Sequence, residues 1–267
     1  MMLAAFIFKG YKSSERYKVM QKVASSDPFQ TLISSLRLVL IYIMLFVLSL
    51  YVAWFALAKV DYAYPLWYSM LNIDQHIEEF APQNDYGKAD FALISQEERL
   101  KVFADIVTAV HSSGEGLNTI RYQLPNNLSK LMLTYEEVVH LQDVANLIDA
   151  IHYLALVMVV LLVALLVWRP QALAQSKWVA IASIGLVALI TLVIAIIGAT
   201  EVFYWLHTVV FPDNHKWFFY YQESLMSTSM KAPDLFLAIG AGILIVALPI
   251  FIAARWWLMK KFPTVLK

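Results

Sequence analysis

Four stretches of the chain are apolar over about the length that a helix needs to cross a lipid bilayer. A hydrocarbon core about 30 Å thick takes roughly 20 residues of helix, because backbone polar groups find no water inside it. The qualifying segments are residues 38–58, 149–168, 178–200 and 235–257, and Pro249 should bend the last of them. The pattern predicts an all-α, polytopic membrane protein with four transmembrane helices.

The basic residues predict how these helices are oriented, because Lys and Arg are retained on the cytoplasmic side of a membrane. Residues 1–37, the short loop 169–177 and the tail from Arg255 onward hold 12 of the 20 basic residues but only two of the 20 acidic ones. We therefore expect residues 1–37, 169–177 and 258–267 to be cytoplasmic, with both termini inside.

Two segments, residues 59–148 and 201–234, are then extracytoplasmic and are long for simple connections. Ser95–Glu98 and Thr134–Glu137 in the first segment are signatures of helix starts, in which side chains cap free backbone amides. Glycine, proline and asparagine between residues 114 and 127 indicate turns. The first segment is predicted to be a small helical domain.

The second signature begins a helix that no breaker interrupts before Trp168, which makes it about 34 residues or 50 Å long. On this helix His140 and Asp143 share a face, because residues three apart are neighbours. If the third span continues as helix past Thr200, His207 stands at a similar height above the membrane. Two histidines from different segments would then meet near the lipid headgroups.

Composition and charge limit the chemistry that these segments can carry. The chain is 60% apolar with a mean hydropathy of +0.63, and its formal net charge is zero, so a nucleic-acid partner is not expected. It has no cysteine, which excludes disulfides, thiolate catalysis and cysteine zinc sites. No phosphate-binding loop, nucleophile elbow or dinucleotide fingerprint is present, and no cofactor is expected.

Histidine is the residue best suited to acid–base chemistry near neutral pH. His76, His111 and His215 lie in polar loop contexts and are interpreted as surface residues, whereas His152 is expected to pair with Asp149. His140 and His207 remain as candidates. His207 is isolated in an apolar run, within an aromatic-rich loop of the kind that anchors a protein at the membrane interface.

The residues around these two histidines resemble the lipoprotein intramolecular transacylase family, Lit, whose members are four-span bacterial membrane proteins. Glu137–Val144 is similar to the family's His-x-x-Asp-Val segment, and Leu206–Phe211 to its Phe-His-x-x-Phe-Phe segment. A third series with the family's order is Trp217–Phe219, Ser224–Met226 and Pro233–Phe236. The chain also departs from the family pattern. Leu206 and Val210 stand where the family has aromatic residues, and residues 212–216 differ from the family's glycine-containing turn.

The resemblance implies an acyltransferase of the bacterial cytoplasmic membrane, with its active site on the extracytoplasmic face. Members of the family move the sn-2 acyl chain of a diacylglyceryl-modified lipoprotein onto the α-amine of its own N-terminal cysteine. The implied partners are this lipoprotein substrate and membrane lipids. The implied catalytic residues are His140 and His207 as base and acid, with Asp143 orienting His140, while Trp217, Phe219 and Ser224 are expected to bind substrate.

Two other functions stay open at this point. One is a membrane metal-dependent hydrolase of a lipid or lipid phosphate, whose nitrogen and oxygen ligands would come from His140, Asp143, His207, His215 and Glu223. The other is a non-catalytic envelope sensor that binds a peptide, lipid or protein partner.

Overall fold

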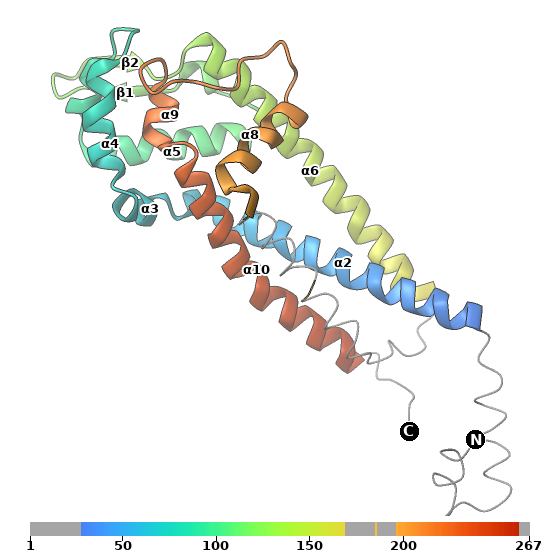
Figure 1. Ribbon diagram of the computed structural model, residues 1–267. Coiled ribbons are helices and arrows are strands. Elements are labelled where there is room, and N and C mark those ends of the chain that lie inside the picture. Colours follow the sequence, from blue (N-terminus) through green and yellow to red (C-terminus); the bar gives the residue numbers. More distant parts are fainter. Residues whose placement is uncertain (1–27, 169–184, 186–195, 262–267) are drawn as a thin grey trace, which may run out of the picture.

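Three long apolar helices form the body of the protein. The computed structural model describes residues 28–168, 185 and 196–261 (Figure 1). In that part of the chain, three helices are long and apolar enough to cross a membrane. They are α2 (Pro28–Ala58), α6 (Tyr135–Trp168) and α10 (Asp234–Lys261). They correspond to the first, second and fourth predicted spans.

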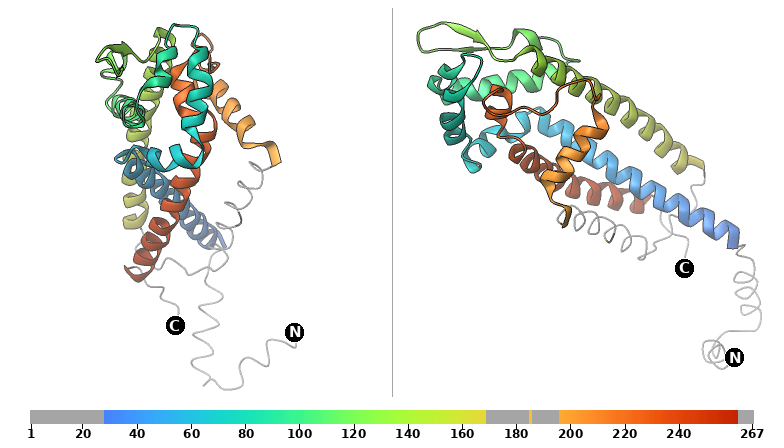
Figure 2. Two further views of the ribbon diagram at one scale, coloured as in Figure 1. Left: turned by 90° about the vertical axis from the view of Figure 1, so that its left-hand side faces the viewer. Right: turned by 45° about the horizontal axis from the view of Figure 1, so that its top comes forward.

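Helix α2 lies between the other two long helices and packs against both of them (Figures 1 and 2). Arg37 Nε on α2 donates a 2.8 Å hydrogen bond to the carbonyl of Leu165 on α6. Side chains that face away from these contacts are apolar and exposed, such as Leu156 at 63% and Ile245 at 68%. Such surfaces are stable against lipid and would be unfavourable in water.

A domain of short elements lies at one end of the long helices (Figure 1). Its helices are α3 (Tyr64–Met70), α4 (Ile73–Phe80), α5 (Gln96–Val110) and α9 (Leu225–Met230). It also contains short 3₁₀ segments at Asp61–Ala63, Ala81–Gln83, Ala89–Leu93 and Leu117–Thr119. The prediction of a small, mostly helical domain between the first and second spans is confirmed.

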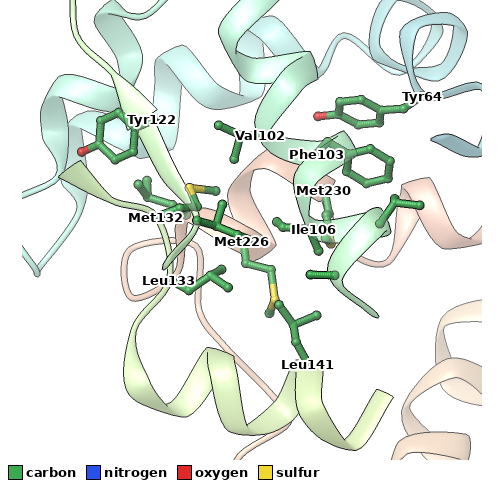
Figure 3. Packing of buried hydrophobic residues seen from close by; sticks show 14 of the residues in the cluster. Tyr64, Val102, Phe103, Ile106, Tyr122, Met132, Leu133, Leu141, Met226 and Met230 are labelled. Carbon is green, nitrogen blue, oxygen red and sulfur yellow. The ribbon is translucent and has the colours of Figure 1, made fainter. Parts of the chain in front are cut away.

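The core of this domain joins residues that are distant in the sequence (Figure 3). The rings of Tyr64 and Phe103 stack with centroids 3.8 Å apart. Met226 of α9 lies beside Leu141 of α6, and Met230 belongs to the same cluster, so the segment that follows the third span completes the core formed by residues 59–148. The two predicted outer segments therefore form one folded unit.

Both predicted helix starts are present, although they differ in detail. Ser95 Oγ accepts a 3.2 Å hydrogen bond from Glu98 N, but the Glu98 carboxyl accepts from Gln123 N instead of turning back. Thr134 and Glu137 form both halves of the capping box. Helix α6 then continues for 34 residues to Trp168, which confirms the predicted length.

The turns predicted between residues 114 and 127 are present, and a short hairpin that was not predicted is built around the second of them. Strand β1 (Arg121–Gln123) pairs antiparallel with β2 (Ser129–Leu131), with Arg121 opposite Leu131. The predicted turn residues make the bend between the strands, where Asn127 has a φ of 61°. Strands of three residues are too short to give an alternating pattern, which is why the sequence did not predict them.

Several expectations lie outside the described residues. Most of the predicted third span, residues 178–200, falls there, as do most of segment 1–37, the whole loop 169–177 and residues 262–267. The helix expected past Thr200 is present and carries His207, although the backbone leaves helical geometry at Gly198 just before it. Helix α8 (Ala199–Val210) begins after Gly198, whose φ of 101° favours glycine and ends helical geometry. Helix α10 contains Pro249, and the bend expected there stays a prediction.

Candidate active site

His140 and His207 lie side by side although they belong to different helices. His140 stands on the second turn of α6, and His207 on the last turns of α8. Their ring centroids are 6.0 Å apart, with an angle of 31° between the planes. The structure therefore brings together the two residues that the sequence singled out.

The surroundings of His140 are apolar and aromatic. Its side chain is buried at 7% exposure, and its Nδ1 has no hydrogen-bond partner in the described part of the chain. The rings of Phe211 and Phe219 lie 4.8 Å and 6.0 Å from the His140 ring. An imidazole in such a setting stays neutral, because burial without a partner disfavours its charged form.

His207 is held in a defined orientation by its own helix. Its Nδ1 lies 2.7 Å from the carbonyl oxygen of Phe203, which can only accept a hydrogen bond. The proton must therefore sit on Nδ1, which leaves Nε2 of the neutral ring as the basic nitrogen. Burial lowers the pKa of His207 below its ordinary value of 6.5, against the smaller opposite effect of the Phe203 hydrogen bond. His207 is thus set up as a base near neutral pH.

The two histidines line a cavity of about 510 Å³. Its walls come from α2, α5, α6, α8, α9 and α10, from the turn after α2 and from the loop between α8 and α9. They carry no Asp, Glu, Lys or Arg among the described residues. Trp217 and Phe219, both predicted to bind substrate, line it, and the Trp217 ring lies 5.2 Å from His207. The volume and the mostly apolar lining with a few polar groups are typical of a small-molecule or lipid site.

Asp143 does not contact His140 by a hydrogen bond. Its Oδ2 accepts a 2.6 Å hydrogen bond from Nδ1 of His215, in the loop that leads from α8 to α9. Any support that Asp143 gives to His140 is therefore electrostatic. The interpretation of His215 as an ordinary surface residue is wrong, because it anchors this loop to α6.

Ser224 does not line the cavity. Its fully buried hydroxyl donates a 2.5 Å hydrogen bond to Glu137 Oε1 and accepts one from Ser227 N, which caps α9. Ser227 lines the cavity instead. The role of Ser224 is therefore to position the start of α9, which differs from the substrate contact predicted from the sequence.

The other three histidines are all partnered or buried outside the cavity lining. His76 is 8% exposed, contrary to its interpretation as a surface residue, and burial lowers its pKa to about 4. His111 shares a 2.7 Å hydrogen bond with Tyr62. His152 bonds to Tyr51 at 2.8 Å, and the expected pair with Asp149 is not formed.

Sequence reasoning missed Glu137, Phe211, Tyr62 and Trp54. Glu137 is fully buried and accepts hydrogen bonds from three residues, whereas the other three residues line the cavity. The capping signature had pointed to Glu137, but only as a local feature. Among the described residues, no three His, Asp or Glu side chains lie close enough to share a metal ion, so the metal-dependent alternative gains no geometric support.

Comparisons with known proteins identify the family of this chain. The family model described as lipoprotein intramolecular transacylase Lit matches residues 37–227. A structure of the membrane integral Lit from Bacillus cereus, determined in meso with a histidine-to-arginine substitution, superposes with a TM-score of 0.56. The two chains are 18% identical, and the match covers 87% of this chain and 93% of that chain. A comparison with curated proteins found no match. The chain belongs to the lipoprotein intramolecular transacylase family and is a multi-span integral membrane acyltransferase.

Proposed function

We propose that this protein moves the sn-2 acyl chain of a diacylglyceryl-modified lipoprotein onto the α-amine of the same lipoprotein's N-terminal cysteine. The products are an amide at the cysteine and a free hydroxyl at the sn-2 position. The proposal depends above all on the 6.0 Å pairing of His140 and His207 beside an apolar cavity of about 510 Å³.

The chemistry needs one base and one acid close to the ester. An α-amine has a reference pKa of about 8, so a weak base can keep it uncharged as it attacks. The amine nitrogen bonds to the ester carbonyl carbon, and the bond from that carbon to the sn-2 oxygen breaks. One proton leaves the amine and one reaches the departing oxygen, so the reaction is balanced without a cofactor.

The fixed tautomer of His207 suits it to accept a proton, because its Nε2 is the free nitrogen. We assign the base and acid roles to His140 and His207 as a pair, without fixing which residue has which role. A neutral imidazole can accept a proton as a base, and the imidazolium that results can donate it as an acid. Because amine and ester belong to one molecule, holding them in attack geometry supplies much of the acceleration. Trp217 and Phe219 shape the apolar wall against which the lipid lies.

We further propose that the cavity opens on the extracytoplasmic side, with residues 59–148 and 201–234 outside and both termini cytoplasmic. The support is the charge distribution, with 12 of 20 basic residues in the segments assigned to the cytoplasm. A lipoprotein substrate is modified on that outer face, where its cysteine and glyceryl ester lie at headgroup height.

Mass spectrometry of the N-terminal lipopeptide tests the proposal. A diacylglyceryl lipoprotein is produced with the protein in cells that lack other N-acylating enzymes, and fragmentation locates each acyl chain. We expect an N-acyl, monoacylglyceryl peptide with the natural protein and none with His140→Ala or His207→Ala.

His152→Ala is the matched control, because His152 lies outside the cavity lining and bonds to Tyr51. It should retain the product, while expression of all variants is checked by immunoblot. An unchanged diacylglyceryl peptide with well-expressed natural protein would refute the proposed reaction.

A further inference from the structure

The cavity beside the two histidines is elongated along α6 and α10. Its lining positions recur every three or four residues along both helices, from His140 to Ile151 on α6 and from Pro233, which directly precedes α10, to Ile243 on α10. At 1.5 Å per residue these stretches are about 16 Å and 15 Å long. Both helices leave the outer domain in the same direction, so the cavity extends from the histidines toward the apolar ends of the helices (Figure 1).

This length matches the hydrocarbon of one membrane leaflet. A bilayer core of about 30 Å gives about 15 Å for each leaflet, which is the depth that one acyl chain fills. The lower walls are apolar, with Val144, Ile148 and Ile151 on α6 and Phe236 and Ile243 on α10. The polar groups that can act on an ester, His140 and His207, lie beside the first turns of this lining.

Gly240 makes a gap in the wall of α10. It lines the cavity two turns below Pro233, and a Cβ placed on it would meet no atom within 4 Å. Gly242 on the same helix does not line the cavity, and a Cβ there would lie 3.4 Å from the ring of Trp67. Of these two helical glycines, Gly240 is the one that leaves room inside the cavity.

We propose that the cavity holds the transferred acyl chain and that Gly240 sets the longest chain it accepts. The ester lies at His140 and His207, and the methyl end of the chain points toward Gly240 and Ile243. This inference rests on the proposed transacylase function, because it identifies what that reaction places in the cavity.

Gly240→Leu tests the inference directly. Leu favours helix more than Gly does, so the variant should fold, and its side chain would project into the cavity. The substrates are synthetic diacylglyceryl lipopeptides that differ only in the sn-2 chain, which is laurate, palmitate or stearate. We expect near-natural transfer of laurate and a loss of about tenfold or more for stearate, because one methylene too many in an apolar pocket has this effect.

Ile245→Phe is the matched control. It adds bulk to the same helix, but Ile245 is 68% exposed and lies outside the cavity lining, so the chain-length profile should not change. Ile243→Ala enlarges the cavity where the methyl end is placed and should raise stearate transfer relative to palmitate. Thermal unfolding of each variant in detergent separates loss of folding from a change in selectivity.

The inference is overturned if folded Gly240→Leu transfers the three chains in the natural ratio, whether at the natural rate or uniformly slower. A failure of the proposed function is recognised separately, because the natural protein would then transfer no chain. In that case native mass spectrometry with N-acetylated lipopeptides, which bind but cannot react, still tests the cavity. Gly240→Leu should weaken stearate binding more than laurate binding, and equal binding of both would refute the acyl-chain site.

Discussion

Ser224 donates a 2.5 Å hydrogen bond to Glu137 in the interior of the domain of short elements, where both side chains are fully buried. The same Glu137 oxygen accepts from Met226 N at 3.2 Å, and the other oxygen accepts from Thr134 N. This contact joins the first turn of α6 to the start of α9. It therefore fixes the turn that precedes His140 against the helix that carries Ser227 into the cavity wall.

We expect Ser224→Ala to lower the free energy of unfolding by about 1–3 kcal/mol, because it removes a hydrogen bond from a buried carboxyl group. Denaturant unfolding of the purified protein in detergent measures the change. Ser229→Ala is the control, since its hydroxyl donates only to the Met226 carbonyl at 3.0 Å. A loss for Ser224→Ala no larger than for Ser229→Ala would contradict the importance of the Glu137 contact.

The hydrogen bond between Asp143 and His215 gives a second prediction, on activity. If Asp143 acts by anchoring the loop, Asp143→Ala and His215→Ala should slow acyl transfer by similar factors, and the double variant should be no slower than either one. Additive effects are expected only for residues that act independently. Initial rates with a diacylglyceryl lipopeptide decide the matter.

A much larger loss for Asp143→Ala than for His215→Ala would mean that Asp143 acts on His140 directly, as the family resemblance implied. Lys216→Ala serves as the control for loop changes in general. Lys216 neighbours His215 and pairs with Glu223 at 2.7 Å on the surface, where ion pairs contribute little.

The features predicted correctly from sequence depend on residues close together in the chain. The Thr134–Glu137 box needs only three residues of separation, and the length of α6 needs only an unbroken run without Pro or Gly. The approach of His140 and His207 was expected because helical rise places both at one height above the bilayer.

The features that were missed depend on contacts across the chain or on a single backbone angle. Nothing near Ser224 reveals that its partner is Glu137, and Asp143 was paired with its helical neighbour His140 when the fold places His215 closer. Gly198 ends one helical segment through its φ of 101°, which an apolar run does not disclose. Tertiary packing decided the partners of Ser224 and Asp143, and one backbone angle decided where α8 begins.

The lowered pKa of His207 predicts how this residue titrates. Burial disfavours the imidazolium, so the folded ring should stay neutral at pH 6.5 and gain its proton only below that value. The proton is bound more weakly in the folded state than in the unfolded state. This group therefore destabilises the fold as the pH falls below 6.5 toward the folded pKa.

NMR titration of the protein with isotopically labelled histidine, in detergent, measures this pKa, and the signal lost in His207→Ala assigns it. A midpoint below 6.5 is expected. A midpoint at or above 6.5 would show that the ring is solvated or carries a charged partner, and the assignment of His207 as a neutral base would fail.

Three consecutive residues after α2, Asp61, Tyr62 and Ala63, have positive φ angles of 50°, 54° and 59°. Left-handed backbone costs a residue with a Cβ about 1–2 kcal/mol, and glycine is free of this penalty. The turn is held by Trp67 Nε1, which donates to the Tyr62 carbonyl at 2.9 Å, and by the contact of Tyr62 with His111.

Ala63→Gly should therefore raise the free energy of unfolding by about 1 kcal/mol, after the greater freedom of glycine in the unfolded chain is counted. Ala104→Gly in the middle of α5 is the opposite control and should lower it by a similar amount. Unfolding of both variants under one set of conditions gives the comparison, and two losses of equal size would show that the turn is not strained.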